Sequence, residues 1–221
     1  MSVRKGTEID GKSRRKIHQS GTRKRPFVVH PRSFKKGYDM RMHAIPEITL
    51  DTNCVINLYD ANSASRMSVD ELAAILKYAD DGEVDVMVAT RIAADLERDK
   101  SCRRAADLLE RIEPLPIFGT VARLDVSKWD SGDVWVGDDD VALVERVRRA
   151  LFPTLNSSDR RYYNKLADID HLVGHIRARR DVFVTDDLEI RKKASGLSTT
   201  DNLSVMTPKE CLAYIEGRVG K

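Results

Sequence analysis

The chain has 221 residues, of which 41% are hydrophobic and 33% charged, and its formal net charge at pH 7 is +3. This length suits one or two globular domains. No apolar stretch is long enough to cross a membrane, and no apolar run follows the basic N-terminus as a secretory signal requires. The three cysteines are too few and too scattered for a disulfide framework or a zinc knuckle, which predicts a cytoplasmic protein.

The net charge hides a division of the chain into a basic arm and an acidic body. Residues 1–43 hold thirteen Lys and Arg against three acidic residues, a net charge of +10, whereas residues 44–221 carry a net charge of −7. The basic arm has few large apolar residues and no sustained periodicity, which predicts disorder when it is alone. Its charge is compatible both with contact to nucleic-acid phosphates and with a solvated tail without function.

The first half of the acidic body alternates strand and helix signals. Runs that favour β-structure predict strands at Ile48–Leu50 and Val84–Ala89. Asp51-Thr52-Asn53 follows the first strand and leads into an apolar run, 54–58, that begins a helix. Further helices are predicted at Val69–Tyr78 with Ser68 as its N-cap, at Thr90–Arg98, and at Ser101–Ile112, ahead of Pro114 and Pro116.

An irregular segment precedes the second half. We interpret residues 117–139 as a loop or hairpin insertion in which Trp129 and Trp135 form a small core rather than a stacking surface for bases. Asp138-Asp139-Asp140 lacks the pattern of a calcium loop and is explained by the start of a helix. The remaining predicted elements are helices at 140–151 and Asp159–Ala178, a strand at Asp181–Thr185, a short helix, a strand at Leu203–Met206, and a final helix from Pro208 to Glu216.

Strands that alternate with helices predict the α/β class, with a parallel sheet covered by helices on both faces. We therefore expect one α/β/α sandwich over residues 46–216, preceded by the basic arm. Ligands of such sheets bind beyond the carboxyl ends of the strands. The chain contains neither GxGxxG nor GxxxxGK[ST], the motifs typical of dinucleotide-binding folds and of P-loop nucleotide-binding proteins, so the sequence does not favour either function.

Four aspartates are candidates for a shared site at that edge of the sheet. Asp51 ends the first predicted strand and Asp187 follows the strand at Asp181–Thr185, while Asp95 and Asp168 lie on helices. Carboxylates brought together repel one another, so protons or a divalent cation must accompany them. Oxygen ligands favour Mg²⁺ or Mn²⁺ over zinc, and such ions activate water for attack on phosphorus.

Four short runs in this order resemble the motifs of PIN-domain nucleases: ITLDTNCVI at 48–56, DIDHL at 168–172, FVTDD at 183–187 and VMTPKE at 205–210. The resemblance covers about residues 46–216. It implies a PIN fold and an endonuclease that depends on Mg²⁺ or Mn²⁺ and acts on RNA. Small PIN proteins are often the toxin of a toxin–antitoxin pair, so the resemblance also implies an inhibitory protein partner or a homodimer.

The resemblance assigns roles residue by residue. It implies that Asp51, Asp168 and Asp187 hold the metal, and that Asp95 is the fourth catalytic acid. The family usually has Glu before Leu at that fourth position; Asp95-Leu96 departs from it by one methylene, and Glu97 is the rival. The positions that order the site are Asn53 and Thr185, with Asp186 and His171 as further supporting residues.

Each of these residues also has a purely structural interpretation. Asp51, Asn53 and Asp187 suit helix caps, and Asp95 and Asp168 suit solvated helix surfaces. His171 and His175 are spaced as zinc ligands on a helix, but HxxxH without a third ligand is a weak zinc signal, and we expect His171 to pack beside the site.

Two other functions compete with the nuclease. One is an RNA-binding module that keeps the fold without turnover, which the substituted fourth acid favours. The other is a phosphatase of the haloacid dehalogenase type, whose nucleophilic aspartate also ends a first strand. That chemistry needs a second aspartate two residues later, where this chain has Asn53.

Overall fold

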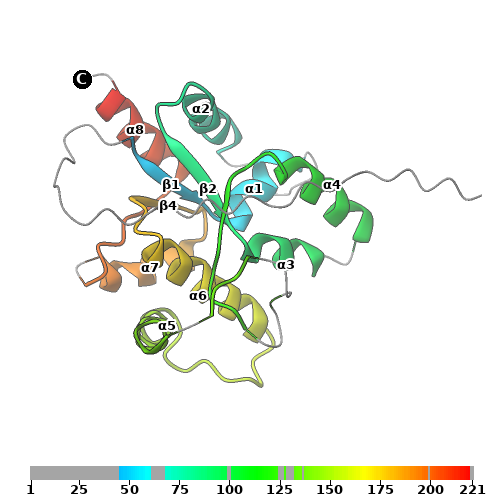
Figure 1. Ribbon diagram of the computed structural model, residues 1–221, viewed down its shortest axis with the longest axis vertical. Coiled ribbons are helices and arrows are strands. Elements are labelled where there is room, and N and C mark those ends of the chain that lie inside the picture. Colours follow the sequence, from blue (N-terminus) through cyan, green and yellow to red (C-terminus); the bar gives the residue numbers. More distant parts are fainter. Residues whose placement is uncertain are drawn as a thin grey trace, which may run out of the picture.

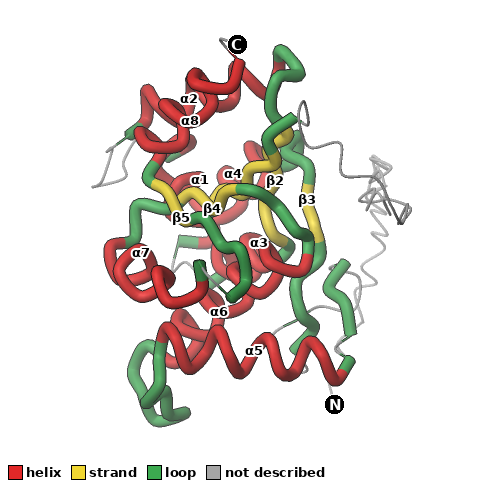
Figure 2. The backbone as a smooth tube through the Cα atoms, turned by 90° about the vertical axis from the view of Figure 1, so that its left-hand side faces the viewer, coloured by secondary structure: helices red, strands yellow, loops and turns green. Residues whose placement is uncertain are grey.

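The computed structural model describes residues 45–60, 68–98, 101–123, 127, 132–135, 137–198 and 200–219. The predictions for the basic arm and for Trp129 lie outside the described residues. The described residues form an α/β fold around a five-stranded, all-parallel sheet with strand order β3-β2-β1-β4-β5 (Figures 1 and 2). The strands are β1 (Glu47–Leu50), β2 (Asp85–Ala89), β3 (Ile117–Phe118), β4 (Val182–Val184) and β5 (Val205–Met206).

Strand β1 is the centre of the sheet. Its last residue, Leu50, is aligned with Val88 of β2 on one side and with Val184 of β4 on the other. The parallel pairing continues past the strand, because the backbone N–H of Asp51 donates to the carbonyl oxygen of Val184 at 3.0 Å. The residues that follow β1 and β4 therefore emerge at the same edge of the sheet.

Helices cover both faces of the sheet, as predicted. Side chains alternate along each strand, so Ile48 and Leu50 of β1 pack into one core and Phe183 of β4 into the other. The first core is closed by α1 (Thr52–Tyr59), α2 (Val69–Asp80), α4 (Cys102–Ile112) and α8 (Pro208–Val219), and the second by α5 (Asp138–Leu151), α6 (Tyr162–Arg177) and α7 (Leu188–Ala194). Helix α3 (Arg91–Glu97) contacts both α4 and α6.

The structure corrects three details of the sequence prediction. Residues 117–139 do not form a plain insertion, because the segment opens with β3, which pairs in parallel with β2. Trp135 does not join a small core: its side chain is 63% exposed. Ser68 has a left-handed backbone (φ 65°, ψ 20°) and makes no side-chain hydrogen bond to cap α2.

A buried group of charges joins α3 to α6. Asp170 of α6 is 1% exposed and lies 2.7 Å from a guanidinium nitrogen of Arg91, at the start of α3. The guanidinium of Arg123, which follows β3, donates to both carboxylate oxygens of Asp170 at 2.7–2.9 Å. Removing one partner from such a buried set leaves an uncompensated charge, at a cost of about 3–5 kcal/mol. This contact fixes the spacing of two helices that carry candidate site residues.

No helix among the described residues combines the length and the apolar character that a lipid bilayer requires of a spanning segment.

Close packing of α6 on the segment after β3 requires a glycine at position 174. A Cβ atom at Gly174 would lie 2.9 Å from Cγ2 of Thr120 and 3.0 Å from Cε2 of Phe118. We expect Gly174→Ala to lower the free energy of unfolding by about 1–3 kcal/mol through overpacking. Gly217→Ala on α8, where an added Cβ meets nothing within 4 Å, should leave stability unchanged or raise it by up to about 1 kcal/mol. Urea unfolding of both variants measures the difference; equal effects would contradict the close approach.

Candidate functional site

Asp51 lies at the carboxyl end of β1 and is also the N-cap of α1. Its side chain is 5% exposed. One carboxylate oxygen accepts from the backbone N–H of Thr52 at 2.7 Å, and the other accepts from the hydroxyl of Thr185 at 2.7 Å. Burial raises the pKa of Asp51 above its ordinary value, although these hydrogen bonds and the nearby His171 act in the opposite direction. The helix-cap interpretation is thus correct, and it does not exclude a place in the site.

Thr185, just after β4, ties three of the predicted residues together. Besides donating to Asp51, its hydroxyl oxygen accepts from the side-chain amide of Asn53 at 3.2 Å and from the backbone N–H of Asp187 at 3.0 Å. The hydroxyl therefore aligns the start of α1 with the start of α7. The Oδ1 atom of Asn53 is buried without a hydrogen-bond partner among the described residues.

Asp95 of α3 faces α6 rather than solvent. Its Oδ2 atom lies 2.8 Å from Nε2 of His171 and accepts from the hydroxyl of Thr52 at 3.1 Å. Arg98 pairs with its other oxygen. Glu97, the rival for this position, has an exposed side chain. The structure therefore brings Asp95, and not Glu97, to the other carboxylates.

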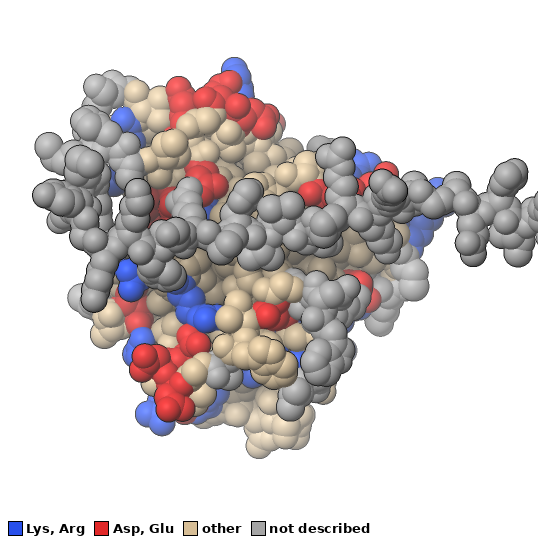
Figure 3. Space-filling view, in the orientation of Figure 1, with Lys and Arg blue, Asp and Glu red and all other residues tan. Residues whose placement is uncertain are grey.

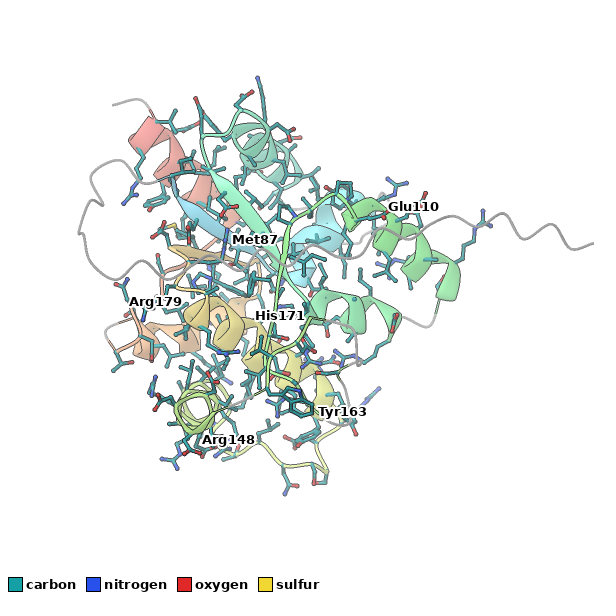
Figure 4. The ribbon with its side chains drawn as sticks, in the orientation of Figure 1. Met87, Glu110, Arg148, Tyr163, His171 and Arg179 are labelled. Carbon is teal, nitrogen blue, oxygen red and sulfur yellow. The ribbon has the colours of Figure 1, made fainter. Side chains whose placement is uncertain are left out.

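His171 is buried where α6 passes α3 (Figure 4). Burial lowers the pKa of His171, but its hydrogen bond to Asp95 and the surrounding carboxylate charges outweigh that effect, so the net direction is upward. The same contact, together with the charge of Arg98, outweighs the burial of Asp95 and lowers its pKa. A positively charged imidazole is therefore favoured in the middle of the acidic cluster.

Asp168 of α6 experiences the combined field of the cluster. Burial, followed by the negative charges of Asp51, Asp187 and Asp95, raises the pKa of Asp168 to about 8, although His171 opposes the shift. Burial contributes most to this shift, and the charges of the other three carboxylates add to it. The cluster formed by Asp51, Asp95, Asp168 and Asp187, which we call the carboxylate cluster, thus draws on residues at β1, α3, α6 and α7.

Asp187 and Asp186 have different environments although they are adjacent. Asp187 caps α7, with one oxygen accepting from the backbone N–H groups of Glu189 at 2.6 Å and Ile190 at 3.1 Å. Asp186 instead accepts from the side-chain amide of Asn57 at 3.4 Å, and burial raises its pKa. Asp187 therefore belongs to the carboxylate cluster, whereas Asp186 is held toward the other end of α1.

Sequence reasoning missed two contributors. The hydroxyl of Thr52 donates to Asp95 and lies 3.1 Å from Nε2 of His171. The side-chain amide of Asn57 donates to Asp186. Thr52 lies inside the LDTN run, so its position next to Asp51 was a usable signal. Asn57 appears in the sequence only as one polar residue of an apolar helix, and its role depends on the packing of α1 against the end of β4.

The two histidines of the HxxxH pattern do not share a ligand. His175 lies beneath the sheet, with Nδ1 2.9 Å from the hydroxyl of Thr49 and its ring edge-on to Phe183. Burial and the charge of Arg180 lower the pKa of His175 to about 3. His175 is therefore a neutral packing residue, whereas His171 faces Asp95.

The donor set of the carboxylate cluster suits a hard divalent cation, because it consists of oxygen atoms whose mutual repulsion a cation relieves. Its geometry is not that of a preformed cage. Within the ranges that the structure describes, no group of three or more His, Cys, Asp and Glu side chains is placed so that it could hold a metal ion. Ligation by Asp51, Asp168 and Asp187 therefore stays a prediction, and it requires their side chains to move toward the ion.

Comparison with known proteins adds no assignment: neither a protein-family model nor a curated protein matches this chain.

The raised pKa of Asp168 predicts a specific dependence of stability on pH. The folded chain keeps this proton up to pH about 8, whereas the unfolded chain releases it near 3.8. Between these values the folded state binds more protons, so rising pH destabilises it, by at most about 1.4 kcal/mol per pH unit. Asp168→Asn lacks this loss. In urea unfolding without divalent ions, the stability of Asp168→Asn relative to the parent should increase from pH 5 to pH 9. Parallel pH curves would show that Asp168 does not carry the proton.

The contact between His171 and Asp95 predicts a graded response to substitution. His171→Leu leaves the buried side of Asp95 without its donor, which should cost about 1–3 kcal/mol of unfolding free energy. His171→Gln places an amide N–H near the position of Nε2 and should cost less. Thermal unfolding at pH 7 measures both variants. A larger loss for Gln than for Leu would mean that His171 contributes through packing alone.

Proposed function

We propose that this protein is a PIN-like, metal-dependent endoribonuclease that hydrolyses RNA phosphodiester bonds. The observation that carries this proposal is the carboxylate cluster. Burial, together with the charges of three acidic side chains from separate elements, raises the pKa of Asp168 to about 8. Such accumulation of like charge opposes folding unless it serves a ligand of opposite charge, and strongly perturbed groups of this kind are typical of functional sites.

The fold is consistent with this proposal without identifying the family. The sheet has the order β3-β2-β1-β4-β5, and ligands of open parallel sheets bind at their carboxyl edge where the order reverses. Here the order reverses at β1, between its two neighbours β2 and β4, and Asp51 follows β1 at that edge. The motifs that resemble those of PIN-domain nucleases at 48–56 and 183–187 meet at this same edge.

Asp51, Asp168 and Asp187 would hold Mg²⁺ or Mn²⁺. When bound, such an ion supplies a positive charge that activates water and stabilises the oxygen leaving phosphorus. The hydroxyl of Thr185 and the backbone N–H of Thr52 fix the two oxygens of Asp51, and the backbone of α7 fixes Asp187. These contacts hold Asp51 and Asp187 at the carboxyl edge of the sheet, from which their side chains would move toward the ion.

No covalent nucleophile is required. Cys54 is close to Asp51, but burial raises the pKa of its thiol well above the ordinary value, and its Sγ donates to the carbonyl oxygen of Val184. A thiol in this state is inert. The phosphatase alternative is not favoured either, because the side chain at the position of its second aspartate is the amide of Asn53, which donates to Thr185.

One observation favours a second function, an RNA-binding or interaction module without turnover. The described side chains form no ready three-ligand metal site, and Asp95 already pairs with His171 and Arg98. A carboxylate that already pairs with two basic groups binds a cation more weakly than an unpaired carboxylate does. The RNA substrate, an inhibitory protein partner and a homodimer remain predictions from the sequence.

A cleavage assay on a mixed-sequence RNA with Mn²⁺ or Mg²⁺ distinguishes the two functions. We expect cleavage by the parent chain, its abolition by EDTA, and a loss of roughly 100-fold or more in Asp51→Asn and Asp187→Asn, because a bound cation contributes several kcal/mol to such reactions. Asp139→Asn, which removes an exposed carboxylate on α5, is the matched control and should retain activity.

Thermal unfolding provides a readout that does not depend on turnover. Mn²⁺ should raise the melting temperature of the parent and of Asp139→Asn, but not that of Asp51→Asn, because only a ligand that binds the folded state stabilises it. RNA binding with neither cleavage nor stabilisation by Mn²⁺ would exclude the nuclease and favour the module without turnover.

A further inference from the structure

Basic residues accumulate outside the carboxylate cluster in two segments of the acidic body that lie near each other. Residues 157–165 and 188–194 together hold six Lys and Arg against two acidic residues, whereas residues 44–221 as a whole have a net charge of −7. The first segment runs into α6 and the second is α7. These helices lie beside each other above α5 in both views of the backbone (Figures 1 and 2).

Two of these lysines are held over one aromatic ring. Phe152, which follows α5, is 4% exposed. The Nζ atoms of Lys165 on α6 and Lys193 on α7 lie 5.5 Å and 4.6 Å from its ring centroid. A cation over a buried ring has a preferred position. Both ammonium groups are therefore partly immobilised before any ligand binds, which lowers the entropic cost of a contact.

A third cation lies at the start of α6. Arg161 is the N-cap residue of that helix, and its carbonyl oxygen accepts from the backbone N–H of Lys165 at 3.0 Å. We call Arg161, Lys165 and Lys193 the basic patch. Its acidic neighbours are Glu189, 2.6 Å from Lys193, and Asp159, 3.2 Å from Lys165. The first pair is exposed and the second is partly exposed, and ion pairs that water reaches are weak, so a phosphate can replace either carboxylate at small cost.

The basic patch is aligned with the carboxylate cluster along α6. Arg161, Lys165 and Asp168 have the spacing i, i+4, i+7, which places them on one face of the helix. The helix rise separates Lys165 from Asp168 by about 4.5 Å and Arg161 from Asp168 by about 10 Å along the axis. If one phosphate of an RNA strand lies at the carboxylate cluster, its neighbours along α6 would lie near Lys165 and Arg161.

We propose that the basic patch binds the phosphate backbone of single-stranded RNA beside the phosphodiester at the carboxylate cluster. This proposal rests on the proposed function, because it names the path of its substrate. It also answers a physical difficulty of that function: the carboxylate cluster repels every phosphate that no cation neutralises, so the adjacent phosphates need fixed positive charges nearby. Phosphate contacts of this type position a nucleic acid without reading its sequence.

The test is the salt dependence of RNA binding by the full chain in EDTA, where no cleavage occurs. The probe is a fluorescein-labelled, 20-nucleotide single-stranded RNA of mixed sequence, followed by anisotropy. Each phosphate contact contributes about 0.7 to the slope of log K against log salt concentration. The paired variant K165Q/K193Q should therefore reduce the slope by about 1.4 and weaken binding roughly 10- to 30-fold at about 0.1 M salt.

Two further paired variants serve as controls. K77Q/K209Q removes two exposed lysines from α2 and α8, on the opposite face of the sheet, where acidic side chains gather around α2 (Figure 3). It changes the net charge equally and should leave the slope near that of the parent. K165R/K193R keeps both charges and should retain the parent's slope, which separates lost charge from lost folding.

An unchanged slope in K165Q/K193Q, or an equal loss in K77Q/K209Q, would overturn the proposal. Because binding is measured without divalent ions, this outcome is independent of the cleavage assay. A chain that binds through the basic patch but never cleaves RNA would retain this inference and lose the nuclease. Metal-dependent cleavage with an unchanged slope in K165Q/K193Q would support the nuclease and overturn the proposal for the basic patch.

Discussion

The repulsion between carboxylates at the carboxyl edge of the sheet is the constraint on which the rest of the structure depends. Parallel pairing of β1 with β4 places Asp51 and Asp187 at one edge, and the helices add Asp95 and Asp168. The resulting charge is relieved in several ways. Asp51 accepts two short hydrogen bonds, Asp95 pairs with basic groups, and Asp168 keeps its proton to pH about 8. A divalent cation would replace that proton and draw the carboxylates toward itself.

Residues of helix α6 contact different parts of the molecule. Asp168 and His171 face the carboxylate cluster, Asp170 is enclosed by two arginines that fix α3 to α6, and Gly174 allows the helix to approach the segment after β3. At its N-terminal end, Lys165 belongs to the basic patch. The buried ion pairs therefore matter less for net stability, which such pairs seldom increase, than for holding Asp95 within reach of His171.

The neighbours of Asp95 determine what it contributes to the cluster. Its carboxylate is held by His171, Thr52 and Arg98. Asp95 thus acts on the cluster through the positive charge that it stabilises on the imidazole. A cation at the cluster would therefore depend on Asp51, Asp168 and Asp187, whereas Asp95 is already paired with His171 and Arg98.

The sequence alone determined the class of fold and the position of most elements. Alternating apolar runs and helical patterns arise from local burial, and the chain at 48–51 or 181–187 carries a strong signal for a buried strand that ends in a polar turn. The same logic placed Asp51 and Asp187 at one edge, because parallel strands share their carboxyl ends. It missed β3, since two residues after Pro116 carry almost no periodicity and become a strand only by pairing with β2.

Only the tertiary structure decided which side chains meet. Asp95 and Glu97 are equivalent in a helical pattern, and the choice between them depends on how α3 packs against α6. The separate roles of His171 and His175, the holding of Asp186 by Asn57 and the gathering of Lys165 and Lys193 over Phe152 likewise depend on contacts between distant segments. Local sequence fixes backbone conformation and the face a residue occupies, whereas the distances between charges, and hence their pKa values and ligands, follow from the packing of whole elements.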